Sequence, residues 1–168
     1  MSCNISNGIS LDCRDSQGGV LYAYIANGPV DSFTETDGLI SAITVGGVAP
    51  TFFKFEFPKQ TASFTETVNA STENGTVFYT QELSMVFNKM EAAKRNQLQL
   101  LAQNQELLVV VKDGNGKFWS IGIERGAVLS AGTNTSGAAY GDRNGMELTL
   151  QGLEASPSYE VDATVVGE

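Results

Sequence analysis

The fold is decided by residues 61–87, which read TASFTETVNASTENGTVFYTQELSMVF. Residues 61–69 and 76–87 alternate apolar and polar side chains, the period of a β-strand with one buried face. The loop between them ends in Asn74-Gly75, a pair that favours a hairpin turn. The stretch therefore predicts a long β-hairpin.

The two faces of this hairpin differ in chemistry. The apolar face carries Ala62, Phe64, Val68, Tyr79, Leu83, Met85 and Phe87. The polar face carries hydroxyl, amide and carboxyl side chains, among them Thr65, Thr67, Thr80, Glu82 and Ser84. Glu66 breaks the pattern on the apolar face, as Phe78 and Val86 do on the polar face. One face is expected to join the core and the other to meet water.

Outside the hairpin, turn-forming residues divide the chain into further short strands. Strands are expected at residues 9–14, 20–26, 39–45, 53–57, 106–112, 117–124, 146–153 and 159–166. The clearest turn is Asp113-Gly114-Asn115-Gly116, between the fifth and sixth of these strands. Residues 130–145 are rich in Gly, Thr, Ala and Asn and are expected to form a loop.

One helix is expected at residues 89–103. Asn88 and Glu91 resemble a capping box at its start. Met90, Ala93, Leu98 and Leu101 share one side at helical spacing and are expected to pack against a sheet. The fold class is therefore mainly β: a β-sandwich or partial barrel of short antiparallel strands, with a long hairpin and one flanking α-helix. A chain of 168 residues is expected to be one domain, residues 1–168.

Composition limits the partners. Ten basic and 19 acidic residues give a net charge of −9, so attraction to nucleic acid or to an anionic membrane is not expected. The sequence contains no recognisable targeting segment and no apolar run near the roughly 20 residues that span a bilayer. Folding in a cytoplasm is therefore expected, with Cys3 and Cys13 as free thiols.

Catalytic patterns are missing. The sequence has no histidine, the commonest general base and metal ligand. Glu66 and Glu82 are candidate paired carboxylates, and Asp113 and Asp142 are candidate calcium ligands, but solubility and turn formation explain these residues more simply. No catalytic, cofactor-binding or metal-binding residues are expected, and the protein is interpreted as a non-enzyme.

Three segments resemble a known family. Residues 92–98 (AAKRNQL), 116–122 (GKFWSIG) and 141–150 (GDRNGMELTL) are similar to segments of small virion proteins of tailed bacteriophages. The order of expected elements also resembles the phage tail-tube fold, which contractile injection systems share. In that family six subunits form a ring, their sheets join into a continuous inner barrel, and the helix lies outside. Stacked rings then make a conduit for DNA.

The resemblance implies a virion structural protein that acts through surfaces. The expected partners are further copies of the same chain and other tail or neck proteins, with DNA passing through without specific binding and no membrane contact. The expected location is the virion tail, after synthesis in the host cytoplasm. Thr65, Thr67, Thr80, Glu82 and Ser84 are expected to line the lumen, because hydroxyls hold water and a carboxylate repels phosphate.

Other functions fit the same sequence. A neck, ring or tail-terminator protein forms one ring rather than a stack, and a contractile injection system also contains a tube. The nine phenylalanines are equally compatible with a β-barrel that binds a small apolar ligand. An enzyme that uses carboxylates alone is a further alternative.

Overall fold

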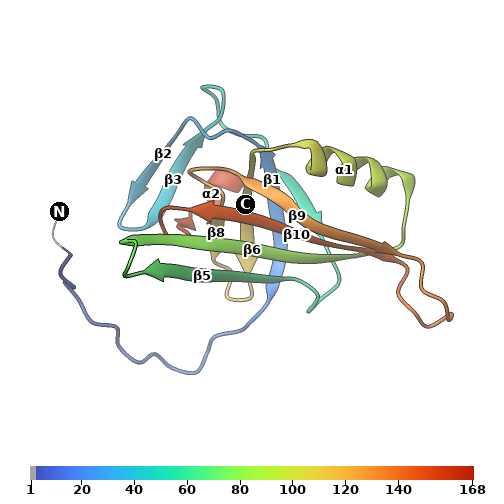
Figure 1. The fold of residues 1–168 in the computed structure, drawn as a ribbon, viewed down its shortest axis with the longest axis horizontal. Coiled ribbons are helices and arrows are strands. Elements are labelled where there is room, and N and C mark those ends of the chain that lie inside the picture. The colour runs from blue at the N-terminus through green and yellow to red at the C-terminus, as the bar shows by residue number, and fades with distance from the viewer. Residues whose placement is uncertain (1–2) are drawn as a thin grey trace.

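Residues 3–168 are described by a computed structural model, and strands dominate them (Figure 1). The strands are β1 (Val20–Asn27), β2 (Ser32–Thr36), β3 (Leu39–Thr44), β4 (Phe53–Glu56), β5 (Ser63–Ser71), β6 (Thr76–Asn88), β7 (Leu107–Asp113), β8 (Phe118–Ile121), β9 (Ala127–Thr135), β10 (Gly145–Glu154) and β11 (Glu160–Val161). The helices are α1 (Ala92–Gln103) and α2 (Ala163–Val166). The expectation of a mainly β fold with a flanking helix is confirmed.

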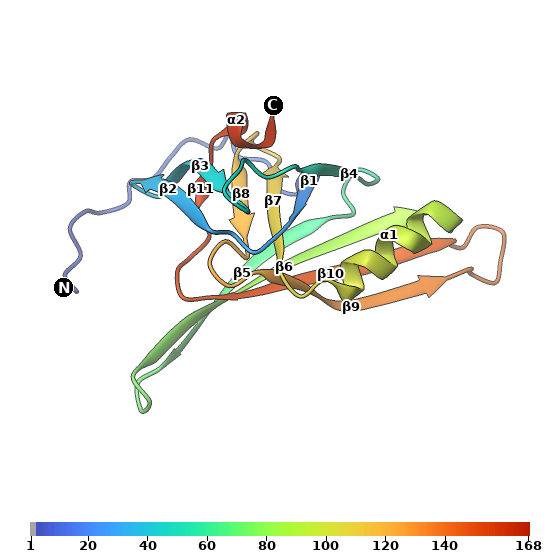
Figure 2. The same ribbon diagram turned by 90° about the horizontal axis from the view of Figure 1, so that it is seen from above.

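The strands form two layers. One layer has the order β4-β1-β7-β8-β11-β3-β2, and the other, β9-β10-β6-β5, contains the longest strands. The layers are continuous only where Leu107 of β7 pairs with Ala127 of β9. Figure 2 shows the four long strands running beneath the rest of the molecule. We call this second layer the four-stranded sheet.

The main core lies between the two layers. It includes Val109 and Val111 of β7, Leu83 and Met85 of β6, and Leu150 of β10, all fully buried. A second cluster, which includes Leu108 and Val110, covers the opposite face of the first layer beneath β2, β3 and α2. Because both faces of β7 are covered, its first five residues, Leu107–Val111, are all buried.

The long hairpin forms as the sequence predicts. β5 and β6 pair antiparallel from Ser63↔Ser84 to Ser71↔Thr76. β7 and β8 also form a hairpin around the predicted turn, in which Asp113 Oδ1 accepts hydrogen bonds from the N–H groups of Asn115 and Lys117. In the β5–β6 hairpin the turn residues and the apolar alternation favour the same register, and in the β7–β8 hairpin the turn residues do so.

The helix differs from its prediction at its beginning. It starts at Ala92, Glu91 is its N-cap without a side-chain capping bond, and the capping box predicted at Asn88 is absent. Lys89 has a left-handed φ of 63°, which ends β6 and delays the helix. Met90 therefore precedes the helix and is 43% exposed, and Ala93 is exposed, so their placement in the core is wrong. Leu101 is buried and Leu98 packs against the core, as predicted.

Three strand predictions also need correction. Residues 127–135 form β9, although most of them were assigned to a loop, because glycine and threonine at the sheet edge hide the strand alternation. The last predicted strand shortens to Glu160–Val161, since Asp162 caps the start of α2. The strand predicted at residues 9–14 is absent, and this segment is exposed and extended away from the body (Figure 1).

Candidate assembly surface

One face of the four-stranded sheet packs on the core and the other faces solvent. Strand register places polar side chains of β5, β6 and β10 together on the solvent side. We call this surface the open face; its polar residues are Ser63, Thr65, Thr67, Thr80, Glu82, Ser84, Glu147, Thr149 and Gln151. It is the side of the sheet turned away from α1 and the first layer (Figure 2).

All five residues predicted to line a lumen lie on the open face. Thr65 is opposite Glu82 and Thr67 is opposite Thr80, while Ser84 pairs with Ser63. Thr65, Thr67 and Glu82 are exposed, and the other two are half-buried. The structure therefore brings these side chains together on one solvent-facing surface.

Short side-chain hydrogen bonds cross the open face. Gln151 Nε2 donates to Glu82 Oε1 at 3.0 Å, and Asn69 Nδ2 donates to Thr80 Oγ1 at 2.8 Å. Three partly exposed apolar residues, Phe78, Val128 and Leu153, interrupt this face. All three lie towards the end of the sheet that carries the β5–β6 turn, while the buried Val86 lies on the same face opposite Glu147 at the other end. Between these two ends the open-face positions of β5, β6 and β10 are polar.

The four-stranded sheet has an unusual charge distribution. All ten lysine and arginine residues of the chain lie outside its four strands. These strands contain four carboxylates, of which Glu82 and Glu147 are exposed on the open face and Glu66 and Glu154 point inwards. The open face therefore presents negative charge with no cation from its own strands, and Arg143 of the β9–β10 loop lies 3.9 Å from Glu147.

Both edges of the four-stranded sheet are unpaired over most of their length. β5 pairs only with β6, and β9 pairs with β7 through Ala127 alone, so within residues 3–168 no strand adjoins the outer side of β5 or of residues 128–135. Neither edge strand contains lysine or proline, two residues that commonly block edge-to-edge pairing. Each edge thus offers a row of free backbone donors and acceptors.

The inward carboxylates are held by hydrogen bonds. Glu66 Oε2 accepts from Gln81 Nε2 at 3.0 Å and from the backbone N–H of Ser158 at 2.7 Å. Burial raises the pKa of the Glu154 carboxyl. Its hydrogen bonds from the backbone N–H groups of Arg125 and Glu124 oppose that rise without cancelling it. These contacts connect the four-stranded sheet to neighbouring loops and explain why Glu66 lies on an apolar face.

The carboxylates considered for chemistry lie apart and have local partners. Asp113 accepts from Trp119 Nε1 within the β7–β8 hairpin, and Asp142 Oδ2 accepts from the N–H groups of Ala138 and Ala139 in the β9–β10 loop. Those two backbone bonds lower the pKa of Asp142. Among residues 3–168, no group of three or more metal-ligating side chains converges.

An apolar groove opens between β4 and α1. Two adjoining hollows of about 510 and 490 Å³ share Lys54, Phe55, Gln97 and Leu101. Phe53 and Leu100 extend the apolar lining, and they are 56% and 59% exposed. We call this feature the β4–α1 groove.

No protein-family model matches the chain, and no curated protein is similar to it. Its function must therefore be inferred from its own surfaces. No helix in the described part of the chain has the length and apolar character needed to cross a membrane.

Sequence reasoning found the open face but missed one edge of its sheet. β9 was overlooked because its residues 130–135, Ser-Ala-Gly-Thr-Asn-Thr, have the composition of a loop.

Proposed function

We propose that the chain is a structural subunit that assembles through the edges of its four-stranded sheet into a ring, and that stacked rings form the tail tube of a bacteriophage. One observation carries this proposal: the four-stranded sheet has two unpaired edges and a polar open face, without a single basic residue in its strands. The resemblance of three sequence segments to phage virion proteins supplies the biological context.

The two edges support a head-to-tail ring. β5 and β9 lie on opposite sides of the four-stranded sheet, so the edge of one copy is available to the other edge of the next copy. Pairing them would satisfy the free backbone groups and leave no exposed edge after ring closure. In a six-membered ring, four strands from each copy would make a barrel of about 24 strands, wider than the 16–18-stranded porins that already enclose an aqueous channel.

The chemistry of the open face supports its placement on the inside. DNA passing through a conduit must not be retained, and retention arises mainly from lysine and arginine contacts to phosphates. Glu82 would repel phosphates, and Glu147 would do so less because Arg143 of the β9–β10 loop pairs with it at 3.9 Å. The threonine and serine hydroxyls would hold a layer of water. The core-facing side of the same sheet carries α1, which would then lie on the outside of the ring.

Proline substitutions in β5 test the proposed edge pairing. Backbone N–H groups alternate between the two sides of a strand. Of the two separate variants Thr67→Pro and Val68→Pro, one therefore loses an N–H on the free edge and the other loses an N–H that bonds to β6. We expect the free-edge variant to keep the thermal unfolding midpoint of the unmodified protein and to lose assembly in sedimentation velocity. The other variant should unfold at lower temperature.

Matched prolines in β2 provide the control. This strand is one of the two free edges of the other layer, and Thr34→Pro and Glu35→Pro should include one folded variant that assembles normally. If both β5 variants fold and assemble as the unmodified protein does, edge pairing through β5 is wrong.

A further inference from the structure

The N-terminal segment has the pattern of a strand but forms none in this chain. We call residues 3–13 the N-terminal arm. Ile5, Ile9 and Leu11 all occupy odd positions and share one face of an extended chain, with serine, glycine and aspartate on the other. These three side chains are at least 94% exposed. Three fully solvated aliphatic side chains on one face indicate a surface that becomes buried only when it binds another protein surface.

The base of the arm is fixed by the β7–β8 turn. Asn115 Oδ1 accepts from the N–H of Gln17 at 2.7 Å, and the N–H of Gly114 donates to Gly19 O at 2.9 Å. A Cβ at Gly114 would lie 2.8 Å from Gly18 O, so this close approach requires glycine. From this anchor the arm runs to the side of the molecule opposite α1, as both ribbon views show (Figures 1 and 2).

The β4–α1 groove has the complementary features. β4 pairs with β1 on one side, and no strand of the described chain pairs with its other side. Phe53 and Phe55 point from β4 towards the groove, and Leu100 and Leu101 face it from α1. The groove therefore combines a free backbone edge with an apolar floor, the two requirements for adding an extended peptide as a strand.

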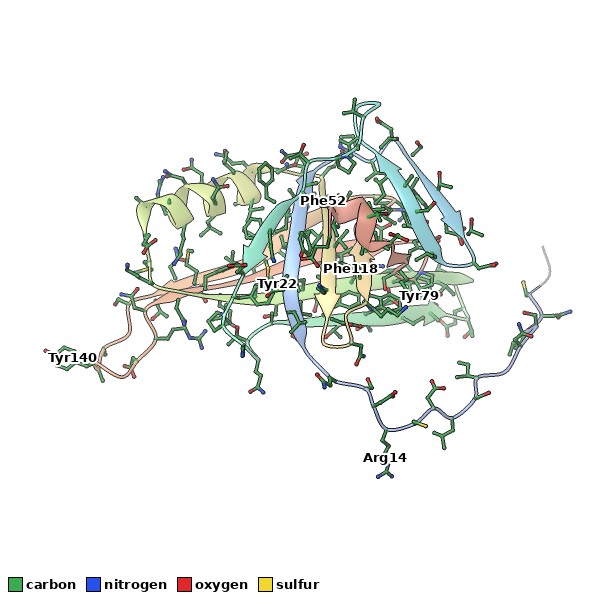
Figure 3. All side chains as sticks on the ribbon, turned by 180° about the vertical axis from the view of Figure 1, so that it is seen from behind. Arg14, Tyr22, Phe52, Tyr79, Phe118 and Tyr140 are labelled. Carbon is green, nitrogen blue, oxygen red and sulfur yellow. The ribbon has the colours of Figure 1, made fainter. Side chains whose placement is uncertain are left out.

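The labelled side chains in Figure 3 locate these two features relative to each other. Arg14 lies on the segment that leads into the arm. It is well away from Phe52, which precedes β4 in the chain, and from Tyr22 of β1, the strand that pairs with β4. The arm leaves the body of the molecule on the side away from α1, and its apolar side chains lie in solvent, not in the groove of the same chain. A second copy supplies an identical groove.

We propose that the N-terminal arm of one copy adds as a strand to the free edge of β4 in another copy and buries Ile9 and Leu11 in the β4–α1 groove. This inference rests on the proposed self-assembly and adds a second contact to the edge pairing of the four-stranded sheet. About eight residues separate the anchor from Ile9, a reach of roughly 26 Å when extended.

Paired substitutions test the role of the apolar face. Ile9→Asp with Leu11→Asp places charges on that face, and Ser6→Asp with Ser10→Asp adds the same charge to the opposite face as a control. We expect the first variant to assemble only at concentrations at least about tenfold higher than the unmodified protein, while the control assembles normally. Both variants should keep the same unfolding midpoint, since the arm is not part of either core.

Disulfide capture tests where the arm binds. One chain carries Leu11→Cys and another carries Leu100→Cys, both in a Cys3→Ser and Cys13→Ser background. A disulfide between these two cysteines can therefore form only between copies. We expect this covalent dimer under mild oxidation, and a rate about tenfold lower when Ser10→Cys replaces Leu11→Cys.

The outcomes separate this proposal from the proposed function. Normal assembly of the Ile9→Asp and Leu11→Asp variant, or assembly without the covalent dimer, would overturn the arm contact and leave edge pairing intact. An unmodified protein that remains monomeric would overturn both. A chain with both cysteines that closes only on itself would show that the arm occupies its own groove.

Discussion

At the scale of single residues, Gln81 connects the two layers through a buried amide. It donates to Glu66 and accepts from the backbone N–H of Gly122 at 3.2 Å. Gly122 has a φ of 72°, and a Cβ there would lie 2.3 Å from the backbone nitrogen of Ala127, so the turn from β8 to β9 folds tightly on itself. This polar bridge is 1% exposed, where an unpaired group is costly.

Removing this amide is expected to destabilise the fold. Gln81→Leu keeps the size of the side chain but leaves the Gly122 N–H without its partner and removes one of the two hydrogen bonds to Glu66 Oε2. The free energy of unfolding in urea should fall by about 1–3 kcal/mol. Gln151→Leu is the control, because its bond to Glu82 lies on the open face and its loss should change stability by less than about 0.5 kcal/mol. Equal effects of the two substitutions would show that the buried bridge has no special role.

Glu168 fastens the C-terminal segment after α2. Its carboxylate accepts from Tyr24 Oη and Lys112 Nζ, and Lys54 Nζ lies 3.6 Å away. The hydrogen bond from Lys112 and the one from Tyr24 lower the pKa of Glu168 to about 2. Burial raises the pKa of Tyr24, and its hydrogen bond to Glu168 raises it further.

The lowered pKa of Glu168 predicts a specific acid sensitivity. The folded protein binds this proton only near pH 2, whereas the unfolded chain binds it near pH 4.5. The stabilisation is therefore fully present above about pH 4.5 and is lost as the pH falls towards 2. Urea unfolding between pH 2 and 7 should show Glu168→Gln less stable than the unmodified protein at neutral pH, with the difference vanishing near pH 2. A difference independent of pH would contradict this account.

At the scale of elements, α1 has one buried anchor. Leu101 packs in the main core, whereas its neighbour Leu100 is exposed in the β4–α1 groove. Leu101→Ala should lower the free energy of unfolding by about 2–5 kcal/mol because it leaves a cavity. Leu100→Ala should change it by less than about 0.5 kcal/mol. Thermal or urea unfolding checks both, and an effect on Leu100 as large as that on Leu101 would mean that α1 packs through a different face.

The sequence predicts elements well where two local signals agree. In the β5–β6 hairpin, alternation and Asn74-Gly75 specify both the strands and the face that carries Thr65 and Thr67. For α1, periodicity located the helix and its anchor Leu101, but Lys89 adopts a left-handed backbone that no sequence pattern announced, so the start was placed too early.

Long-range pairing explains the elements that sequence reasoning missed. β9 is a strand because β10 lies beside it, not because of its own residues, which favour loops. The strand predicted at residues 9–14 shows the opposite case, because no strand of the described residues 3–168 pairs with this segment. Neither outcome follows from local propensity, since a strand requires a partner as well as a pattern.

At the scale of the whole molecule, the proposed placement of the open face predicts a gain of DNA retention. Changing Thr65, Thr67 and Thr80 to lysine puts three cations on a sheet whose strands have none. If this surface lines a conduit, assembled tubes should trap DNA, and the retention should weaken steeply with salt through counterion release. Filter binding at 50 and 200 mM salt measures it.

A matched variant controls for charge alone. Lysines at Ser32, Thr34 and Thr36 of β2 add the same charge outside the four-stranded sheet. That variant is expected to bind DNA only on the outside of the assembly, where nuclease removes it. Tubes of the Thr65, Thr67 and Thr80 variant that assemble normally and protect no DNA from nuclease would place the open face elsewhere.

The most direct measurement is electron cryomicroscopy of the purified protein at concentrations where it associates. We predict rings or stacked rings in which β5 of one copy pairs with β9 of the next. Thr65, Thr67 and Glu82 should lie on the inner wall and α1 on the outside. Particles that remain single copies at high concentration, or rings whose inner wall is formed by another surface, would contradict this prediction.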